Sequence, residues 1–269
     1  LLPRDWDPSG HAKDLLAPGG WICKATPDGK NYFVHSMGFR NQYDIALNRF
    51  GDIFTYDSDM EYDMGSPWYR PTRICHATAG SEFGWRNGTG KWPAEYEDSM
   101  PSQLDIGPGS PTGMVSGKGA RFPARYQRAL YALDWTFATI RAIHLTPDGR
   151  GYRAESEELV AGKGLPLTDA VIGRDGAMYF LTGGRRTGSA LWRVSYHGSE
   201  STDPVPYRSK TLALMDPTAA RAALGSADRV ARFEARTALE HQGPAVFREL
   251  LAAANLSPWE RIHAAIGLA

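Results

Sequence analysis

The sequence predicts a mainly β protein, a partial β-propeller followed by a short α-helical segment of the HEAT type. Three observations predict this class. Short apolar or alternating runs, separated by Gly, Pro, Asn and Asp, fill the chain to about residue 200 without a long amphipathic helix between them. A pattern of strands and turns repeats within this part. Beyond about residue 214 the chain is rich in Ala, with apolar residues at helical spacing.

Ten segments of the first part have the pattern of β-strands. They are Trp21–Ala25, Tyr32–Met37, Tyr43–Leu47, Asp52–Asp57, Arg73–Ala77, Ala129–Leu133, Ile140–Leu145, Ala170–Ile172, Ala177–Thr182 and Leu191–Tyr196. Short turns join most of them, and the Asp-Gly pairs at 28–29, 148–149 and 175–176 suit tight connections. We therefore expect antiparallel sheets.

The repeat defines the blades. A unit that runs from Thr26-Pro27-Asp28-Gly29 to the strand at 52–55 returns from Thr146-Pro147-Asp148-Gly149 to the strand at 177–180, and a weaker copy begins at Pro111. Four-stranded units of roughly 40–70 residues are typical of propeller blades. About three units fit before residue 200, whereas a ring needs about 4–8. We expect the remainder of the propeller on residues outside this chain or on another chain.

The second part, residues 214–269, predicts short paired helices. Asp216-Pro217-Thr218 has the pattern of a helix start, and Ser257 is the expected N-cap of the last helix. The expected helices are Ala227–His241, Ala245–Ala254 and Pro258–Leu268. Paired helices of this length are typical of a HEAT-like α-solenoid. The predicted domains are therefore 1–205 and 214–269.

Charge and composition exclude several partners. Among the 269 residues, 30 Lys plus Arg balance 30 Asp plus Glu, so no basic field is available for nucleic acid. No apolar run approaches the roughly 20 residues of a membrane helix. Cys23 and Cys75 are the only cysteines; two separate buried thiols are favoured over one disulfide, and there is no CxxCH haem motif.

An acidic loop follows the strand that ends at residue 57. Its carboxylates are Asp57, Asp59, Glu61 and Asp63. Their repulsion must be offset by a cation, by arginines or by solvent, and oxygen ligands in a loop suit calcium. The alternative is a solvated acidic loop that pairs with Arg70 or Arg73.

The chain resembles the soluble quinoprotein glucose and sorbosone dehydrogenases, six-bladed propellers that bind pyrroloquinoline quinone and calcium. The shared pattern is Gly-x-Arg-Asn at 38–41, a strand, Gly51, a strand that ends in Thr55, the acidic loop, and Phe83-Gly84-Trp85. The chain more closely resembles the bacterial membrane-bound dehydrogenase-domain or haem-binding-domain family, in which HEAT repeats and usually a cytochrome c domain follow the propeller. Residues 68–73, 83–90, 166–173 and 183–187 carry this likeness.

The resemblance implies a set of site residues. Arg40 and Asn41 match the pair that lines the quinone and substrate site, and Asp57, Ser58 and Asp59 match the calcium loop. Two departures matter. Pro166 and Thr168 stand where the glucose dehydrogenases have cofactor-binding arginines, and Thr136 stands near their cofactor-binding lysine. Arg185 and Arg186 are candidates to supply the missing positive charge; an exposed basic pair on a hairpin is the alternative. The resemblance places the catalytic histidine on a blade that this chain lacks.

Two functions follow as expectations. The first is part of a periplasmic, quinoprotein-type sugar or alcohol dehydrogenase that passes electrons to a c-type cytochrome or membrane complex, with pyrroloquinoline quinone and calcium as cofactors. The second is a non-catalytic propeller–HEAT scaffold that binds a protein or a glycan in a larger assembly. The exported location is implied by the resemblance alone, and the sequence favours a chain that is one piece of a longer protein.

Overall fold

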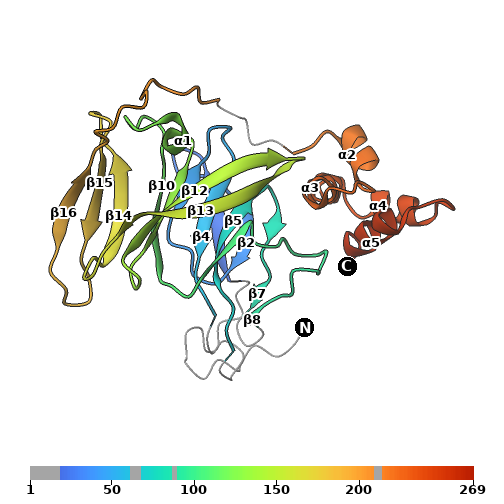
Figure 1. Ribbon diagram of the computed structural model, residues 1–269. Coiled ribbons are helices and arrows are strands. Elements are labelled where there is room, and N and C mark those ends of the chain that lie inside the picture. The colour runs from blue at the N-terminus through green and yellow to red at the C-terminus, as the bar shows by residue number, and fades with distance from the viewer. Residues whose placement is uncertain (1–18, 61–67, 87–89, 209–213) are drawn as a thin grey trace.

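The computed structural model describes residues 19–60, 68–86, 90–208 and 214–269, and places four sheets side by side, followed by a group of helices (Figure 1). Two of the sheets are complete four-stranded antiparallel blades. The first blade consists of β3 (Ile45–Leu47), β4 (Ile53–Asp57), β5 (Thr72–Ala77) and β9 (Leu104–Gly107). The second consists of β10 (Pro111–Ser116), β11 (Leu130–Asp134), β12 (Thr139–Asp148) and β13 (Gly151–Ala161).

The two outer sheets have fewer strands. The third sheet consists of β14 (Leu167–Ile172), β15 (Met178–Thr182) and β16 (Ala190–Val194). The fourth consists of β1 (Gly20–Ala25) and β2 (Tyr32–Phe39), with β6 (Ser81–Glu82) added in parallel to β2. The small pair β7 (Trp85–Arg86) and β8 (Gly90–Lys91) and the single-turn α1 (Ala124–Gln127) complete this part. The described sheets do not close into a ring.

Apolar side chains fill the spaces between neighbouring sheets, as the alternating pattern of the strands requires. Phe54, Tyr56 and Ile74 of the first blade pack against Met114 and Leu130 of the second. A second cluster joins the second blade to the third sheet through residues that include Tyr131, Ile140, Leu167 and Phe180. The strand β10 contacts both β3 and β14, so the inner strands of successive blades are neighbours.

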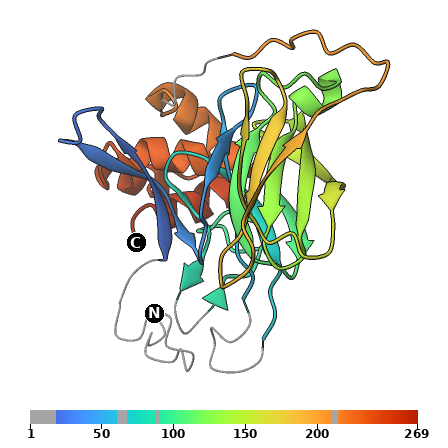
Figure 2. The same cartoon turned by 90° about the vertical axis from the view of Figure 1, so that its left-hand side faces the viewer.

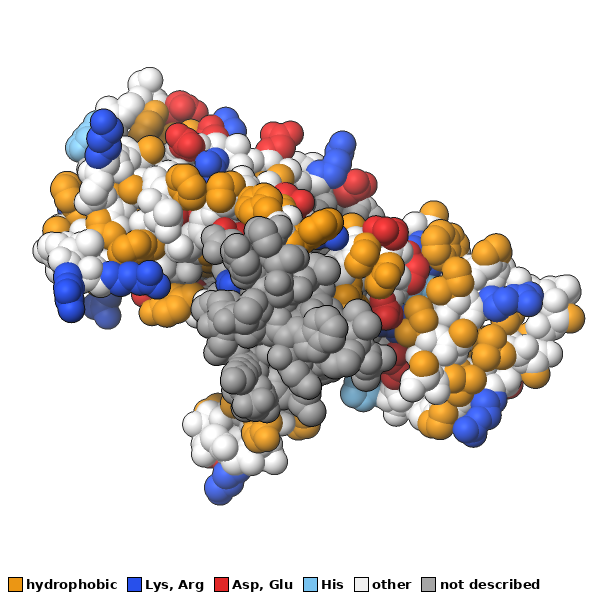
Figure 3. All heavy atoms as spheres, turned by 90° about the horizontal axis from the view of Figure 1, so that it is seen from below, with side chains coloured by type: hydrophobic (Ala, Val, Ile, Leu, Met, Phe, Trp, Pro, Cys, Tyr) orange, Lys and Arg blue, Asp and Glu red, His pale blue; other side chains and the backbone are white. Residues whose placement is uncertain are grey.

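The connections β2–β3, β4–β5, β9–β10, β11–β12 and β15–β16 meet at one end of the sheets, which we call the loop end. Three hydrogen bonds tie the last four of these connections together. The Gly109 N–H donates to Asp59 at 3.2 Å, the Ser110 N–H donates to Asp134 at 3.1 Å, and the Trp135 indole donates to the Gly183 carbonyl at 2.8 Å. Figure 3 looks onto this end and shows basic side chains over the third sheet, at its left.

The helical part begins at Asp216, as the sequence predicts, and contains two helix pairs. The helices are α2 (Pro217–Ala223), α3 (Arg229–Glu240), α4 (Ala245–Leu251) and α5 (Pro258–Ile266). Asp216 and Asp228 cap α2 and α3, and Ser257 forms a capping box with Glu260 at the start of α5. The assignment of this part to the HEAT class stays a prediction. No helix among the described residues is long and apolar enough to cross a membrane.

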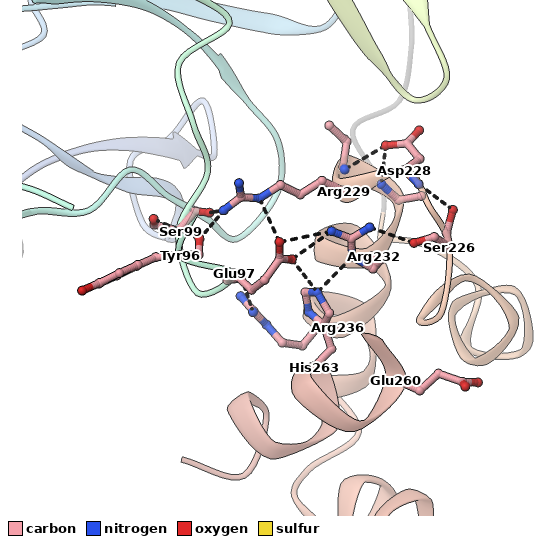
Figure 4. A network of polar contacts seen from close by, with 12 residues as sticks. Tyr96, Glu97, Ser99, Ser226, Asp228, Arg229, Arg232, Arg236, Glu260 and His263 are labelled. Carbon is pink, nitrogen blue, oxygen red and sulfur yellow. Dashed lines mark hydrogen bonds and ion pairs between the residues drawn. The ribbon is translucent and has the colours of Figure 1, made fainter. Parts of the chain in front are cut away.

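The helices dock on the β-sheet part beside the β1–β2 hairpin (Figure 2). Phe233 of α3 is buried in a cluster with Ile22, Phe39 and Phe83 of the β part. The carboxylate of Glu97 contacts three basic side chains of the helices (Figure 4). Its oxygens lie 3.0 Å from a nitrogen of Arg232, 3.0 Å from a nitrogen of His263 and 3.7 Å from a nitrogen of Arg229. Burial lowers the pKa of His263 to about 4, and the charges of Arg236 and Arg232 act in the same direction.

The described residues that follow β16, up to 208, cross the end of the sheets opposite the loop end. Gln127 is buried and holds them: its amide donates to the carbonyls of Thr202 and Asp203 at 3.2 and 2.9 Å and accepts the Val205 N–H at 3.0 Å. The Tyr207 hydroxyl donates to the Gln127 carbonyl at 2.5 Å. This segment is therefore fixed to the second blade.

Two expectations need correction. Both cysteines are free, but Cys23 is exposed on β1, so only Cys75 is the buried thiol that the sequence predicts. The strands β9, β10 and β13 have no counterpart among the predicted strands. In β13 the alternating charged residues lack the apolar pattern of a half-buried strand.

Candidate functional site

Asp57 anchors the loop end. It is the last residue of β4 and is fully buried. Its Oδ1 accepts the backbone N–H groups of Arg40 and Asn41, each at 2.9 Å, and of Ser58 at 3.0 Å. Its Oδ2 lies 3.0 Å from both Nε and Nη2 of Arg73. Asp57 thus fixes the Arg40–Asn41 turn to the end of the first blade.

Arg73 neutralises Asp57 from the neighbouring strand. The two residues are directly paired in the β4–β5 register, and both side chains are buried. The expected pairing of the acidic loop with Arg73 is confirmed at Asp57, but the solvated loop of that alternative is wrong for the described residues, because Asp57, Ser58 and Asp59 are all buried. Burial also raises the pKa of the adjacent Cys75 thiol to about 12, so this cysteine is not a reactive thiolate.

Lys91 is a second buried cation beside the acidic loop. Its Nζ donates to the Ser58 carbonyl at 2.5 Å and to the Pro71 carbonyl at 2.9 Å, and its side chain is buried. Burial lowers its pKa to about 8, an effect that the charge of Asp57 opposes. Lys91 is not among the site residues predicted from the sequence, where its only signal is one charged residue between Gly90 and Trp92.

The described part of the acidic loop does not fit calcium. Both oxygens of Asp57 are occupied by nitrogen donors, one of them a guanidinium, and the Ser58 carbonyl is bound to the Lys91 ammonium. Asp59 is buried and accepts from Gly109. No group of three His, Cys, Asp or Glu that could hold a metal occurs among the described residues. Glu61 and Asp63 lie outside the described residues, so the sequence prediction of calcium in the whole loop stays a prediction.

The structure brings Arg40 and Asn41 to the loop end through the turn after β2. Arg40 is half-buried and its Nη1 donates to the Ser58 hydroxyl at 3.3 Å; Asn41 is exposed. The turn follows Gly38, whose φ is 81° and where an added Cβ would lie 1.6 Å from a carboxylate oxygen of Glu82. A side chain at position 38 is therefore excluded on both grounds.

Arg185 and Arg186 reach the same end from the loop between β15 and β16. Both are exposed, and both have left-handed backbone conformations with φ of 48° and 66°. The Arg185 guanidinium lies 5.4 Å from the centroid of the Trp135 ring. Neither arginine lines the 580 Å³ pocket at this end of the second blade, whose lining includes Asp134, Phe137 and Lys163.

Asp134 is a further buried carboxylate of the loop end that sequence analysis did not select. Its Oδ2 accepts the Tyr56 hydroxyl at 3.3 Å and the Ser110 N–H at 3.1 Å, and its Oδ1 accepts the Phe137 N–H at 2.7 Å. Burial raises its pKa, although these hydrogen bonds oppose the shift. Through its hydrogen bond to Tyr56, Asp134 connects the second blade to the first. Asp57 has a similar role at the end of the first blade, where it connects β4 to β5 and to the turn after β2.

Comparisons with known proteins find similarity only among solved structures; no protein-family model and no curated protein matches. A glucose dehydrogenase-type oxidoreductase from Thermus thermophilus is 17% identical, with a TM-score of 0.48, over 60% of this chain and 46% of that one. The quinone-bound aldose sugar dehydrogenase of Streptomyces coelicolor is 16% identical, with a TM-score of 0.49, over 65% and 51%.

The soluble aldose sugar dehydrogenase of Escherichia coli, in its apo form, is also similar, at 17% identity and a TM-score of 0.45 over 60% of this chain and 46% of that one. This chain thus spans about half the length of the solved structures that it resembles. At these values no activity is transferred to it.

Proposed function

We propose that this chain is part of a quinoprotein-type sugar or alcohol dehydrogenase and that its loop end binds the carboxylates of the quinone. The observation that supports this proposal is the presentation of Arg185 and Arg186. Two successive non-glycine residues in the left-handed region cost roughly 1–3 kcal/mol each. Such conformations persist where the surroundings hold them, and they gather at binding sites.

Local contacts hold the arginine pair in this conformation. The Thr187 N–H and hydroxyl donate to the Gly184 carbonyl at 3.0 and 2.5 Å, which closes the turn. Trp135 holds the loop through Gly183 and presents its ring to Arg185. Within the described part of the chain, neither guanidinium has a carboxylate within 4 Å. An exposed guanidinium fork of this kind suits bidentate binding of a carboxylate.

Pyrroloquinoline quinone carries three carboxylates; in this proposal Arg185 and Arg186 bind two of them, and Arg40, which also donates to Ser58, lines one end of the cofactor. When bound, the quinone would accept two electrons from the alcohol carbon of the substrate. Arg40 would orient one end of the cofactor, and its position is fixed through the backbone bond to Asp57. Pro166 and Thr168 offer no charge, so the arginine pair carries most of the binding in this proposal.

The rest of the proposal concerns partners. The electron acceptor is a c-type cytochrome, the protein is exported, and the remainder of the propeller completes the cavity. These statements rest on the resemblance in sequence. Exposed apolar side chains on the two outer sheets, including Phe33 of β2 and Leu191 of β16, support further propeller beside these sheets.

Dye-linked dehydrogenase activity of the full-length gene product, with added quinone and a panel of sugars and primary alcohols, tests this function. Activity should require the quinone, and the Arg185→Ala/Arg186→Ala variant should lose most of it. The matched control is Arg153→Ala, an exposed arginine on β13. Absence of activity with every substrate, in a folded protein, would contradict the proposal.

A scaffold function is the second candidate, and one observation favours it. Asp57 is already neutralised by Arg73, so the first acidic position of the loop needs no cofactor metal. In that case the loop end would contact a protein or a glycan instead of a quinone. A folded chain that does not bind quinone but retains its helical docking would support the scaffold.

A further inference from the structure

We infer that the ammonium group of Lys91 is the structural cation at the described ends of the loop after β4, where it binds Ser58, one of the residues for which the sequence predicts calcium. The inference is independent of the proposed dehydrogenase function. It concerns which cation holds the two sides of this loop together.

The geometry around Lys91 is that of a cation site made from backbone oxygens. The Ser58 carbonyl, at the start of the loop, and the Pro71 carbonyl, at its end, both accept from Nζ, at 2.5 and 2.9 Å. These two residues flank the loop on the sides of β4 and β5. One buried ammonium therefore closes the loop, as a metal bound to carbonyl oxygens would.

The backbone of Lys91 is also fixed to this loop. Its N–H lies 3.4 Å from the sulfur of Met60, and Met60 forms a two-way backbone bridge with Arg70 at 2.9 and 3.0 Å. The Met60–Arg70 bridge brings the two sides of the loop together. Lys91 is thus attached to the loop through both its main chain and its side chain.

The charges around Lys91 favour an ammonium group at this position over a divalent metal ion. The charged or titratable groups that act on Lys91 are Asp57, Arg73, Cys75 and Arg40. Asp57 attracts it, and Arg73 already offsets that carboxylate. A divalent ion placed at the same carbonyls would meet two buried cations, Lys91 and Arg73, with both Asp57 oxygens occupied. The described donors therefore favour the monovalent ammonium over calcium.

The test is thermal unfolding of the complete chain, with and without calcium. The wild type should melt at the same temperature with millimolar calcium as with a chelator. Lys91→Met keeps most of the side-chain volume but leaves both carbonyls unpaired, and we expect its Tm to fall by on the order of 10 °C. The matched control is Lys24→Met, an exposed lysine of β1, whose Tm should not change.

Chemical rescue separates loss of charge from loss of packing. Lys91→Ala removes a propylammonium-sized group, so added propylammonium should raise its Tm toward the wild type, whereas propanol and sodium should not. Calcium that raises the wild-type Tm by several degrees would overturn the inference. So would a Lys91→Met variant that melts like the Lys24→Met control.

Discussion

Arg73 holds one carboxylate oxygen of Asp57 with both Nε and Nη2, each at 3.0 Å, across the β4–β5 register. The other oxygen of Asp57 accepts three backbone N–H groups, two of them from the Arg40–Asn41 turn. A single buried ion pair therefore positions the turn that would face a cofactor. The pair has a structural role whether or not a cofactor binds.

The first prediction follows from this pair. Asp57→Asn leaves the Arg73 guanidinium buried without a counter-charge and should lower the free energy of unfolding by about 3–5 kcal/mol. Denaturant titration measures this change. The control is Glu158→Gln, which breaks a half-exposed pair with Arg141 and should cost less than about 1 kcal/mol. Equal losses in the two variants would contradict the central position given to Asp57.

The second prediction concerns pH and the helical docking. His263 has a pKa of about 4 in the folded chain, below its ordinary value of 6.5, so the unfolded chain binds more protons between these values. The free energy of unfolding should therefore fall as the pH drops from 6.5 to 4, by roughly 3 kcal/mol from this group. The pKa of Glu97 is lowered, despite its burial, by Arg232 and Arg229, so its contribution is lost in the same direction below pH 4.5.

Denaturant titrations at several pH values measure this slope. His263→Gln should flatten the part between pH 6.5 and 4, because it removes the group that must stay neutral beside Arg236. His197→Gln, at an exposed histidine, is the control and should keep the wild-type slope. An unchanged slope in His263→Gln would show that this histidine does not couple docking to pH.

The third prediction concerns the connection between propeller and helices. Gln127→Ala removes the acceptor of the Val205 N–H and the donor to the Thr202 and Asp203 carbonyls. Hydrogen exchange at Val205 should become about fivefold faster or more, since each lost hydrogen bond weakens the attachment by about 1 kcal/mol. Exchange in the core strand β11 should not change. Exchange at Val205 at the wild-type rate would mean that other contacts hold this segment.

The fold was predictable where the local sequence determines the structure. The strands at 21–25, 53–57 and 73–77 and the helix start at Asp216 follow from apolar alternation and from a side-chain cap. The strand β13 was not predictable in this way, because it lies at the outer edge of its blade, pairs only with β12, and carries charge on its exposed face. Such a strand is specified by its partner rather than by its own pattern.

The candidate site was predictable only where the local sequence carries a signal. Four carboxylates after a strand indicated a charge problem, and Arg73 was one of the expected solutions. Lys91 was not expected, because its partners Ser58 and Pro71 are 33 and 20 residues away and are backbone carbonyls, which have no signature in the sequence. A contact of this kind becomes visible only in the folded chain.

The most direct test of the proposed function is binding of pyrroloquinoline quinone to the full-length protein, in which the remainder of the propeller completes the cavity, measured by isothermal titration calorimetry. We expect saturable binding, weakened about tenfold or more in Arg185→Ala/Arg186→Ala, because charge-assisted hydrogen bonds to the cofactor carboxylates are lost. Arg153→Ala should bind as the wild type does. A folded full-length wild type that takes up no quinone, or a double variant that binds it as tightly as the wild type, would contradict the quinone-binding loop end.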